Sequence, residues 1–222
     1  ITKRAEEKQA PCYPVRPQQL KIKKITRKNI DFSFASRYDD VIPIEIPFVA
    51  EYQVMNMALA YQALMLLAPR FSLAREKILL ALRTVRWAGR MQQVCPEVYF
   101  DGAHNTAGIE EFLKTVRQIG GKKPLLLFSM VKEKDYAAVV RMLSRTDWGG
   151  IVVTHIPDAR GLSVAALQEE FEKNGKETVG INDCRAAYDG VMQKKEPGQT
   201  VFCTGSLYLI GELEKIAGGL KK

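Results

Sequence analysis

An aspartate, a histidine and an asparagine lie within five residues of one another in the segment VYFDGAHNTAG, residues 98–108. The segment lies where a run of β-forming residues gives way to a helical pattern. At the carboxyl end of a strand, Asp101 could accept hydrogen bonds from a ribose or a base, and His104 could lie beside a carboxylate or phosphate. The alternative is structural, with a tight turn and Asn105 or Thr106 as the helix cap. The segment alone leaves both interpretations open.

Three further polar residues could contact a ligand. Arg90, in the segment WAGR, could bind a phosphate bidentately, or it could be a solvated loop arginine. Asn56 interrupts an otherwise apolar helical segment, so it is either a base or ribose contact or a core amide that is satisfied locally. Ser206, in the segment TGSLY, is by default a helix cap.

The common nucleotide, metal and hydrolase motifs are missing from the sequence. No G-x-G-x-x-G follows a predicted strand, and the Gly-Lys pairs at 121–122 and 175–176 lack the rest of a phosphate loop. There is no H-E-x-x-H motif, and no further histidine lies near Asp101 and His104, so we expect no metal site there. The G-x-S-x-G motif of many serine hydrolases is also missing.

The chain carries a formal net charge of +8 over 222 residues, which suggests an anionic partner. Its lysines are spread along the chain, however, and many of them would lie on an ordinary solvated face. In the densest basic run, QLKIKKITRK, Ile22 and Ile25 fit a strand, and no aromatic residues interleave with the charges. We therefore expect no nucleic-acid partner.

The cysteines and the hydropathy indicate the compartment. The four cysteines lie far apart and form no C-x-x-C pair, which favours a reducing cytosol. No signal peptide or long apolar span is present, so we expect no membrane partner. From these features we predict a cytoplasmic protein, and we expect it to be a monomer.

The sequence has two parts with different patterns of secondary structure. Residues 1–86 begin irregularly and then show patterns of two strands and two helices. The strand NIDFSFAS alternates apolar and polar residues, whereas the prolines in VIPIEIP predict an edge strand. The segment EYQVMNMALAYQALMLLA is apolar on nearly every face, which predicts a buried helix, and Ser72 is a plausible N-cap for the next one.

From residue 97 the sequence repeats a strand-then-helix pattern five times. The strands are too apolar to face water, which predicts a mostly parallel sheet covered by helices on both faces. We therefore predict a Rossmann-like, doubly wound α/β domain over residues 87–222, with residues 86–96 acting as a linker. In such a sheet, ligands bind at the carboxyl ends of the strands. The loops expected there are DGAHNTAG, SMVKEKD, HIPDARGLS and TGSLY.

The motifs also resemble those of a known family. The segments GRMQQV and VYFDGAHNTAG closely resemble the segments that lead into and begin the C-terminal domain of folylpolyglutamate synthases, which are members of the Mur ligase superfamily. The segments YQVMNMALAYQAL, VKEKDY and TGSLYLIGEL are similar, in order, to the family's H-Q-x-x-N-x-x-x-A helix, D-K-D loop and G-S-L-Y segment. These matches span residues 53–209, which is most of the chain.

The resemblance implies a role for each matching residue. It assigns Asn56, Arg90 and Asp101 to ATP binding. It places His104 and Ser206 on the side of the substrate cleft where glutamate binds. Three further residues, on loops at the same edge of the sheet, are candidates of lower rank for the site: Lys134, Asp135 and Arg160.

The sequence also departs from the family pattern. Where the family helix opens with Gly-x-His-Gln, this chain has Ala50, Glu51, Tyr52 and Gln53, so the role of that histidine has no counterpart here. The family's ATPase domain carries a phosphate loop and Mg²⁺ ligands, which these residues do not contain. We therefore expect residues 1–86 to be the trailing part of that domain, and the metal ligands and the remaining ATPase portion to lie upstream.

The resemblance implies an ATP-dependent ligase that adds L-glutamate to the γ-carboxyl of folate through an acyl phosphate. Arg90 would offset phosphate charge and His104 would orient the incoming glutamate, so we assign both to catalysis. Three alternatives stay open. They are a dihydrofolate synthase acting on dihydropteroate, a muramyl-peptide ligase, and a ligand-binding module without turnover when the chain is isolated.

Overall fold

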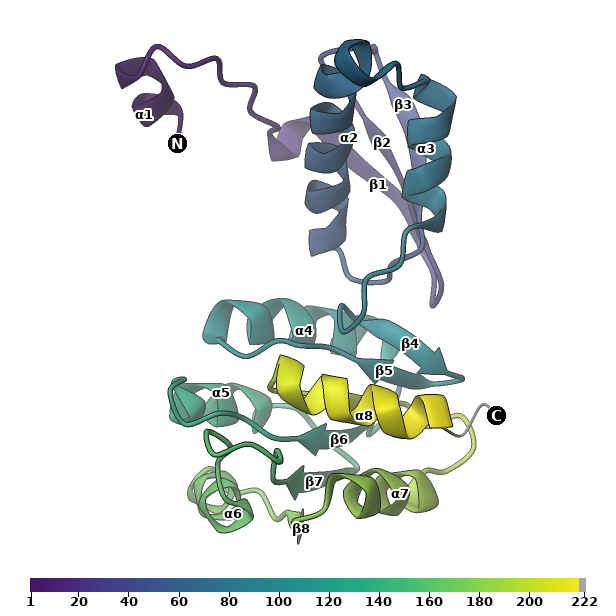
Figure 1. Cartoon of the computed structure of the whole chain (residues 1–222). Helices are drawn as coiled ribbons and strands as arrows, with labels where there is room; N and C mark the ends of the chain where they lie inside the picture. The colour runs from purple at the N-terminus through teal and green to yellow at the C-terminus, as the bar shows by residue number, and fades with distance from the viewer. Residues whose placement is uncertain (220–222) are drawn as a thin grey trace. The chain divides into compact units, whose positions relative to one another are not determined.

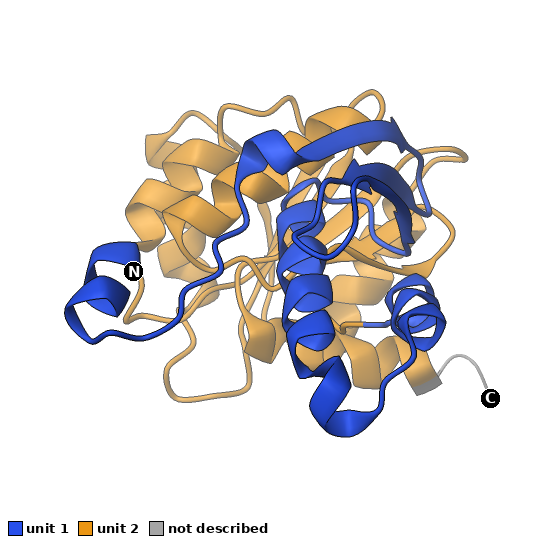
Figure 2. Ribbon diagram, turned by 90° about the horizontal axis from the view of Figure 1, so that it is seen from above, with its two compact units in different colours: residues 1–86 blue, residues 87–222 orange. Residues whose placement is uncertain are grey.

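The computed structural model describes residues 1–219. The chain divides into two compact units, Ile1–Arg86 and Trp87–Lys222, which Figure 2 shows in separate colours. Each unit has its own sheet and its own hydrophobic core. The assignment of residues 1–86 to the trailing part of an ATPase domain stays a prediction.

The first unit is an antiparallel three-stranded sheet in the order β1-β2-β3, accompanied by two long helices (Figure 1). The predicted edge strand is confirmed, because β3 lies at one side of this sheet. The elements of the unit are α1 (Thr2–Glu7), a 3-10 turn (Pro17–Gln19), β1 (Leu20–Ile25), β2 (Ile30–Phe34), β3 (Ile42–Ile46), α2 (Tyr52–Phe71) and α3 (Arg75–Thr84).

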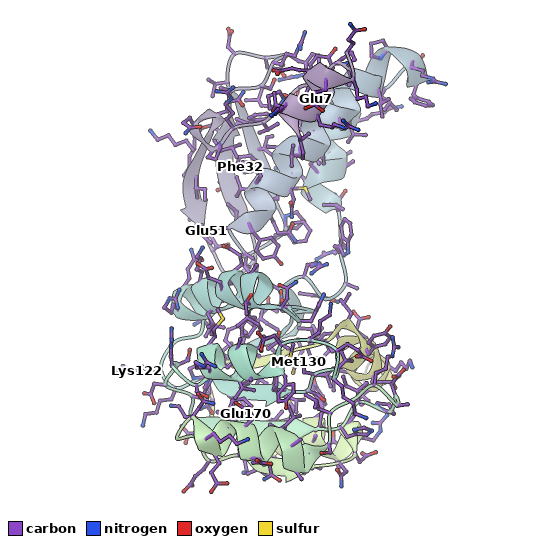
Figure 3. All side chains as sticks on the ribbon, turned by 90° about the vertical axis from the view of Figure 1, so that its left-hand side faces the viewer. Glu7, Phe32, Glu51, Lys122, Met130 and Glu170 are labelled. Carbon is purple, nitrogen blue, oxygen red and sulfur yellow. The ribbon has the colours of Figure 1, made fainter. Side chains whose placement is uncertain are left out.

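One face of this sheet builds the core of the first unit. Alternate residues of β2 are fully buried, and Phe32, labelled in Figure 3, pairs in register with Ile22 on β1 and Ile44 on β3. Because side chains alternate across a strand, this row lies on one face of the sheet, where Phe32 and Ile44 are buried and Ile22 is 37% exposed. Tyr61 of α2 packs edge-to-face against Phe34 in the same core.

The prediction that α2 is buried all round is wrong for this structure. Val54, Met57 and Tyr61 are buried, but Leu66 is 48% exposed and Phe71 is 58% exposed. The helix carries more apolar residues than the single face that packs on the sheet can cover.

The predicted start of the next helix is also wrong. Ser72 ends α2 in the left-handed conformation, with φ at 51°, and α3 begins at Arg75 after Ala74. The backbone N–H of Leu73 closes the end of α2 on the carbonyl of Ala68. A serine between two helical patterns can cap either one, so the local sequence did not distinguish these positions.

The second unit confirms the predicted α/β fold with a mostly parallel sheet. Its six strands lie in the order β4-β5-β9-β6-β7-β8, and every adjacent pair except β4 with β5 is parallel. The strands are β4 (Gln92–Cys95), β5 (Val98–Phe100), β6 (Leu125–Phe128), β7 (Gly150–Thr154), β8 (Val179–Ile181) and β9 (Val201–Thr204). The helices are α4 (Thr106–Ile119), α5 (Tyr136–Leu143), α6 (Val164–Lys173), α7 (Cys184–Lys194) and α8 (Leu207–Gly219).

Strand β4 corrects the prediction that residues 86–96 form a linker. Gln92 pairs with Phe100 and Gln93 with Tyr99, which adds an antiparallel edge strand to the sheet. This strand has four residues and begins with two glutamines, so its sequence has no apolar run that would predict a strand.

Helices cover both faces of this sheet (Figure 1). Phe202 of β9 packs against Phe112 of α4, whereas Phe100 of β5 packs against Tyr188 of α7. Helices α4, α5 and α6 follow one another on the first face, and α7 and α8 share the second. The strands therefore lie between two apolar layers, which explains their apolar sequences.

Strands β5 and β9 are adjacent, but the helices that follow them lie on opposite faces of the sheet. The loops that leave their carboxyl ends therefore diverge. In open α/β sheets such a switch point forms a ligand-binding crevice. The loops here are residues 101–105 and 205–206, which carry Asp101, His104 and Ser206.

Candidate functional site

The carboxylate of Asp101 holds two backbone segments together. Its Oδ1 accepts the N–H of Ala103 and its Oδ2 accepts the N–H of Met91, each over 2.8 Å. The residue is buried, and its own N–H donates to the carbonyl of Cys203 on β9. Asp101 thus ties together the end of β5, the start of the next loop and the Gly-Arg segment.

The Gly-Arg segment bends sharply around Arg90. Gly89 has a φ of 65° and Met91 a φ of 47°, so the residues on both sides of Arg90 are left-handed. The N–H of Gly102 donates to the carbonyl of Gly89 over 2.8 Å, and the N–H of Gly89 donates to Oε1 of Gln92. These bonds fix the backbone of Arg90 beside the loop that carries His104.

Arg90 itself is half-buried, and no carboxylate within residues 1–219 forms an ion pair with it. The N–H groups of this guanidinium are therefore available to an anion. Because the group is planar, two of them can bind two oxygens of a phosphate or a carboxylate at once.

The loop after β5 orients His104 and caps the next helix. Nδ1 of His104 lies 2.8 Å from the carbonyl oxygen of Gly102. A carbonyl can only accept, so Nδ1 carries the proton and Nε2 is the nitrogen left for a ligand. The side chain of Asn105 accepts the N–H of Gly108, which confirms the expected cap of α4.

Ser206 lies directly before α8 and is only 2% exposed. Its Oγ accepts the N–H of Tyr208 over 3.1 Å, so the predicted capping role is confirmed. The hydroxyl proton can still be donated. The preceding Gly205 has a φ of 113°, and a Cβ there would lie 2.2 Å from the carbonyl oxygen of Ser129, so only glycine fits.

The loops after β6 and β7 are joined by backbone hydrogen bonds. The N–H of Lys132 donates to the carbonyl of Arg160, and the N–H of Leu162 donates to the carbonyl of Met130, which Figure 3 labels. On the first loop, Asp135 accepts the N–H of Ala138 and so caps α5. The other two candidates of lower rank, Lys134 and Arg160, are exposed on this pair of loops.

Arg160 makes the most specific side-chain contacts on this rim. Its Nε and Nη2 bind the two carboxylate oxygens of Asp158 over 2.9 and 3.1 Å. The hydrogen bonds from the side chain and the backbone N–H of Arg160 lower the pKa of Asp158 to about 2. The guanidinium also lies over the ring of Tyr208, 4.4 Å from its centroid.

A cavity of about 450 Å³ opens between the same two loops. Nδ1 of His155 lies 3.0 Å from the carbonyl oxygen of Leu162, and Nζ of Lys132 donates to the carbonyl of Ala159. Its size is within the range of small-molecule sites. The lining residues are Lys132, His155, Asp158, Ala159, Gly161, Leu162, Ser163 and Ala166.

Four of the five predicted site residues lie in the second unit, on loops that contact one another. Arg90 and His104 are linked through Asp101 and Gly102, and Oγ1 of Thr204, just before the Gly205–Ser206 turn, donates to the carbonyl of Ala103. The fifth residue, Asn56, lies on α2 of the first unit. It is exposed there, and its Nδ2 donates to Oε1 of Gln53 over 2.9 Å.

The sequence did not reveal Asp158 and Tyr208 as part of this edge. The spacing D-x-R, which allows Asp158 to accept a bidentate pair from Arg160, was the only local signal. The contact of Arg160 with Tyr208 joins residues 48 positions apart, so it depends on the fold.

The described residues form neither a cluster of metal ligands nor a membrane-spanning helix. In residues 1–219 no group of three or more histidine, cysteine, aspartate or glutamate side chains could hold a metal ion. No helix in the same range is both long enough and apolar enough to cross a membrane.

Among curated proteins, the chain is similar to folylpolyglutamate synthases and dihydrofolate synthases. The chain is 25% identical over 200 residues to the folylpolyglutamate synthase of Lacticaseibacillus casei, covering 85% of this chain and 44% of that protein. It is 27% identical over 189 residues to the dihydrofolate synthase/folylpolyglutamate synthase of Bacillus subtilis, covering 83% and 43%. The chain therefore spans about half the length of the curated relatives it matches.

Solved structures share the fold. The folylpolyglutamate synthase of Mycobacterium tuberculosis, complexed with ADP and AMPPCP, superposes with a TM-score of 0.82 at 20% identity, covering 98% of this chain and 52% of that one. The FolC protein of E. coli, in complex with DHPP and ADP, gives a TM-score of 0.77 at 21% identity, covering 100% and 51%.

A family model described as the Mur ligase, glutamate ligase domain matches residues 89–207, more than half of the chain. The match begins at the Gly-Arg segment and ends in the first turn of α8, so it encloses all the loops described above. The chain belongs to the Mur ligase family and carries its glutamate ligase domain.

Proposed function

We propose that this chain is part of an ATP-dependent ligase that adds L-glutamate to the γ-carboxyl group of a folate. The observation that carries the proposal is the pair of backbone bonds between the Gly-Arg segment and the D-G-A-H-N loop. These bonds, from Met91 to Asp101 and from Gly102 to Gly89, gather an unpaired guanidinium and an oriented imidazole at the carboxyl edge of a parallel sheet. The similarity to folylpolyglutamate synthases supports this choice of substrates.

ATP would be the second substrate. Solved relatives were crystallised with ADP or AMPPCP, which supports nucleotide use. Arg90 fits such a ligand because its guanidinium has no carboxylate partner in residues 1–219. Asp101 would contact the nucleotide while it holds the Gly-Arg segment. Asn56 would contribute from the first unit, as the resemblance of its helix implies.

Mg²⁺ is expected with ATP, but the described residues do not form a site for it. Residues 1–219 offer no cluster of three metal-ligating side chains. We therefore assign no step to a metal ligand among the described residues.

The reaction would proceed in two displacements. A carboxylate oxygen of the folate attacks the γ-phosphorus of ATP and releases ADP, which leaves an acyl phosphate. The amine nitrogen of glutamate then attacks the acyl carbon, and phosphate leaves as the amide bond forms. Arg90 would neutralise charge on the phosphate oxygens during both displacements, which is the main demand of this chemistry.

His104 and Ser206 would act on the incoming glutamate. The bond from Nδ1 of His104 to Gly102 fixes the ring, so that Nε2 can accept from the amine or, when protonated, donate to a carboxylate. Ser206 would donate its hydroxyl proton from the start of α8. Their main contribution would be to orient the nucleophile.

The isolated chain would bind ligands without turnover. The family's phosphate loop is not among its residues. We expect activity only from a chain that also contains a phosphate loop.

The proposal is tested by measuring steady-state ADP release, beyond the single equivalent that acyl phosphate formation gives without glutamate, from the full-length protein while folate or glutamate is omitted in turn. Release that requires both substrates supports the ligase. Arg90→Ala should lower kcat/KM for ATP by about a hundredfold, and Arg90→Lys should retain part of the activity because it keeps the charge but loses the planar group. Arg117→Ala, an exposed arginine on α4, is the matched control. ADP release that ignores glutamate would refute the proposal.

A second candidate function is dihydrofolate synthesis, in which dihydropteroate accepts the first glutamate. The relatives that favour it include a probable dihydrofolate synthetase of Schizosaccharomyces pombe, 26% identical over 180 residues and covering 75% of this chain and 43% of that protein. Turnover with dihydropteroate in the same assay would establish this activity. Turnover only with a reduced folate would exclude it.

A further inference from the structure

We propose that Tyr208 and Arg160 are positioning residues, which hold the first turn of α8 against the loop after β7 and thereby fix Ser206 relative to the rest of the candidate site. The inference rests on the proposed function, because the site that the pair would position is the one assigned to glutamate. It concerns residues that the motifs did not assign to any role.

The first turn of α8 contacts the Gly-Arg side of the site through Leu207. A Cβ on Gly102 would lie 2.2 Å from Cδ2 of Leu207, and a Cβ on Gly89 would lie 3.6 Å from the same atom. Leu207 therefore fills the space that these two glycines leave open. Its position links α8 to Gly89, next to Arg90, and to Gly102, in the loop that carries His104.

The same turn contacts the opposite side of the site through Tyr208. The guanidinium of Arg160 lies 4.4 Å from the centre of the Tyr208 ring, a distance typical of a cation–π interaction. Asp158 fixes the plane of this guanidinium through two side-chain hydrogen bonds. Asp158 first, and then Tyr208, raise the pKa of Arg160 above its ordinary value.

The backbone of Arg160 is also bonded to the loop after β6. Its carbonyl accepts the N–H of Lys132, and the adjacent Val131 and Gly161 form an antiparallel bridge. The loop that carries Lys134 and Asp135 is therefore bonded to the loop that Tyr208 contacts.

Two neighbouring residues of α8 thus contact opposite halves of the carboxyl edge, and Ser206 lies directly before them. Tyr208 also donates its N–H to Oγ of Ser206, so a shift of this turn would move the serine. This arrangement gives the last two residues of the G-S-L-Y segment a physical role. The side chain of Leu207 lies against Gly89 and Gly102, and the ring of Tyr208 lies against the guanidinium of Arg160.

The test is a double-mutant cycle in the full-length protein, with glutamate transfer to a reduced folate as the readout. Tyr208→Ala and Arg160→Ala should each raise KM for glutamate about tenfold, which is the range of one partly exposed cation–π contact. Because both changes break the same contact, the double variant should also show about a tenfold rise. Tyr208→Phe keeps the ring and should stay within about twofold of wild type.

Three results would overturn the proposal. The first is a double variant whose fold rise in KM for glutamate equals the product of the two rises in the single variants. The second is a Tyr208→Phe variant as impaired as Tyr208→Ala, which would show that the contact between the ring and the guanidinium does not account for the defect. The third is a pair of single variants whose KM for glutamate matches that of Arg117→Ala, the control at an exposed position of α4.

Hydrogen exchange separates this proposal from the proposed function. In Tyr208→Ala, the amides of Lys132 and Leu162 should exchange faster than in wild type, because their loop loses its support from α8. This measurement needs no turnover, so it decides the positioning role even if the protein transfers no glutamate. Unchanged exchange at both amides would contradict the role.

Discussion

The backbone N–H of Met91 donates a 2.8 Å hydrogen bond to Oδ2 of Asp101, which joins the segment bearing Arg90 to the loop bearing His104. The other oxygen of the same carboxylate accepts the N–H of Ala103. Asp101 therefore has a structural role that is visible in this chain, in addition to the nucleotide contact proposed for it. The two roles can be separated by measuring stability and activity on the same variants.

Replacing Asp101 by asparagine should destabilise the second unit by about 1–3 kcal/mol. The two N–H groups bind different oxygens of Asp101, and in asparagine one of these becomes an NH2 group that cannot accept, so one buried donor would lose its partner. Urea unfolding of the full-length protein, followed by tryptophan fluorescence from the buried Trp148, measures the change.

Asp147→Asn is the matched control, because Asp147 is exposed in the same unit. It should change the free energy of unfolding by less than about 0.5 kcal/mol. Equal stability of Asp101→Asn and wild type would show that the two backbone bonds contribute little.

Two glycine substitutions should differ in how strongly they lower stability. Gly205→Ala should cost about 1–3 kcal/mol or more, because φ is 113° and the new Cβ would collide with the backbone oxygen of Ser129. Gly102→Ala should stay within about 1 kcal/mol of wild type, because its new Cβ meets the half-exposed side chain of Leu207, which can move. Thermal unfolding compares the two variants.

Gly102→Ala should nevertheless impair glutamate transfer, because Leu207 would be displaced from the first turn of α8. A Gly102→Ala variant with full activity, or one less stable than Gly205→Ala, would contradict this account of the G-S-L-Y turn.

Stability of the first unit should depend on pH through Asp39. Burial raises the pKa of this carboxyl, but hydrogen bonds from Tyr61, Ser36 and Arg75 outweigh it and hold the pKa below its ordinary value. The stability from Asp39 is therefore fully present above an unfolded pKa of about 3.9 and is lost as the pH falls through the lower folded pKa.

Hydrogen exchange of α2 amides checks this prediction, with opening free energies compared at pH 6 and pH 3. Asp39→Asn should be less stable than wild type at pH 6. This difference in stability should be smaller at pH 3, because pH 3 lies below the unfolded pKa of about 3.9 and the unfolded wild type then takes up a proton. Asp40→Asn, at the exposed neighbouring position, is the control. A gap that widens at low pH would contradict the assignment.

The parallel sheet was predictable because buried strands carry continuous apolar runs, such as Leu125–Phe128. The position of β9 between β5 and β6 was not, because strand order depends on how the chain crosses from β8 through α7 to β9 rather than on any local pattern. The edge strand Gln92–Cys95 was missed because pairing with β5, not hydrophobicity, makes it a strand.

The candidate site was predictable to a similar degree. The spacing of Asp101, His104 and Asn105 indicated a loop that leads into a helix, and Asn105 does cap α4. The bonds from Met91 to Asp101 and the contact of Arg160 with Tyr208 join distant positions, so only the fold reveals them. The chemical roles of Arg90 and His104 stay predictions.

The most direct test of the central claim is the mass of the product that the full-length protein forms from ATP, L-glutamate and a reduced folate. The account predicts a folate that is heavier by one glutamyl residue, at a rate that collapses in both Arg90→Ala and His104→Ala but not in Arg117→Ala. Glutamate transfer to a UDP-muramyl substrate and not to a folate, or full activity in the Arg90 and His104 variants, would contradict it.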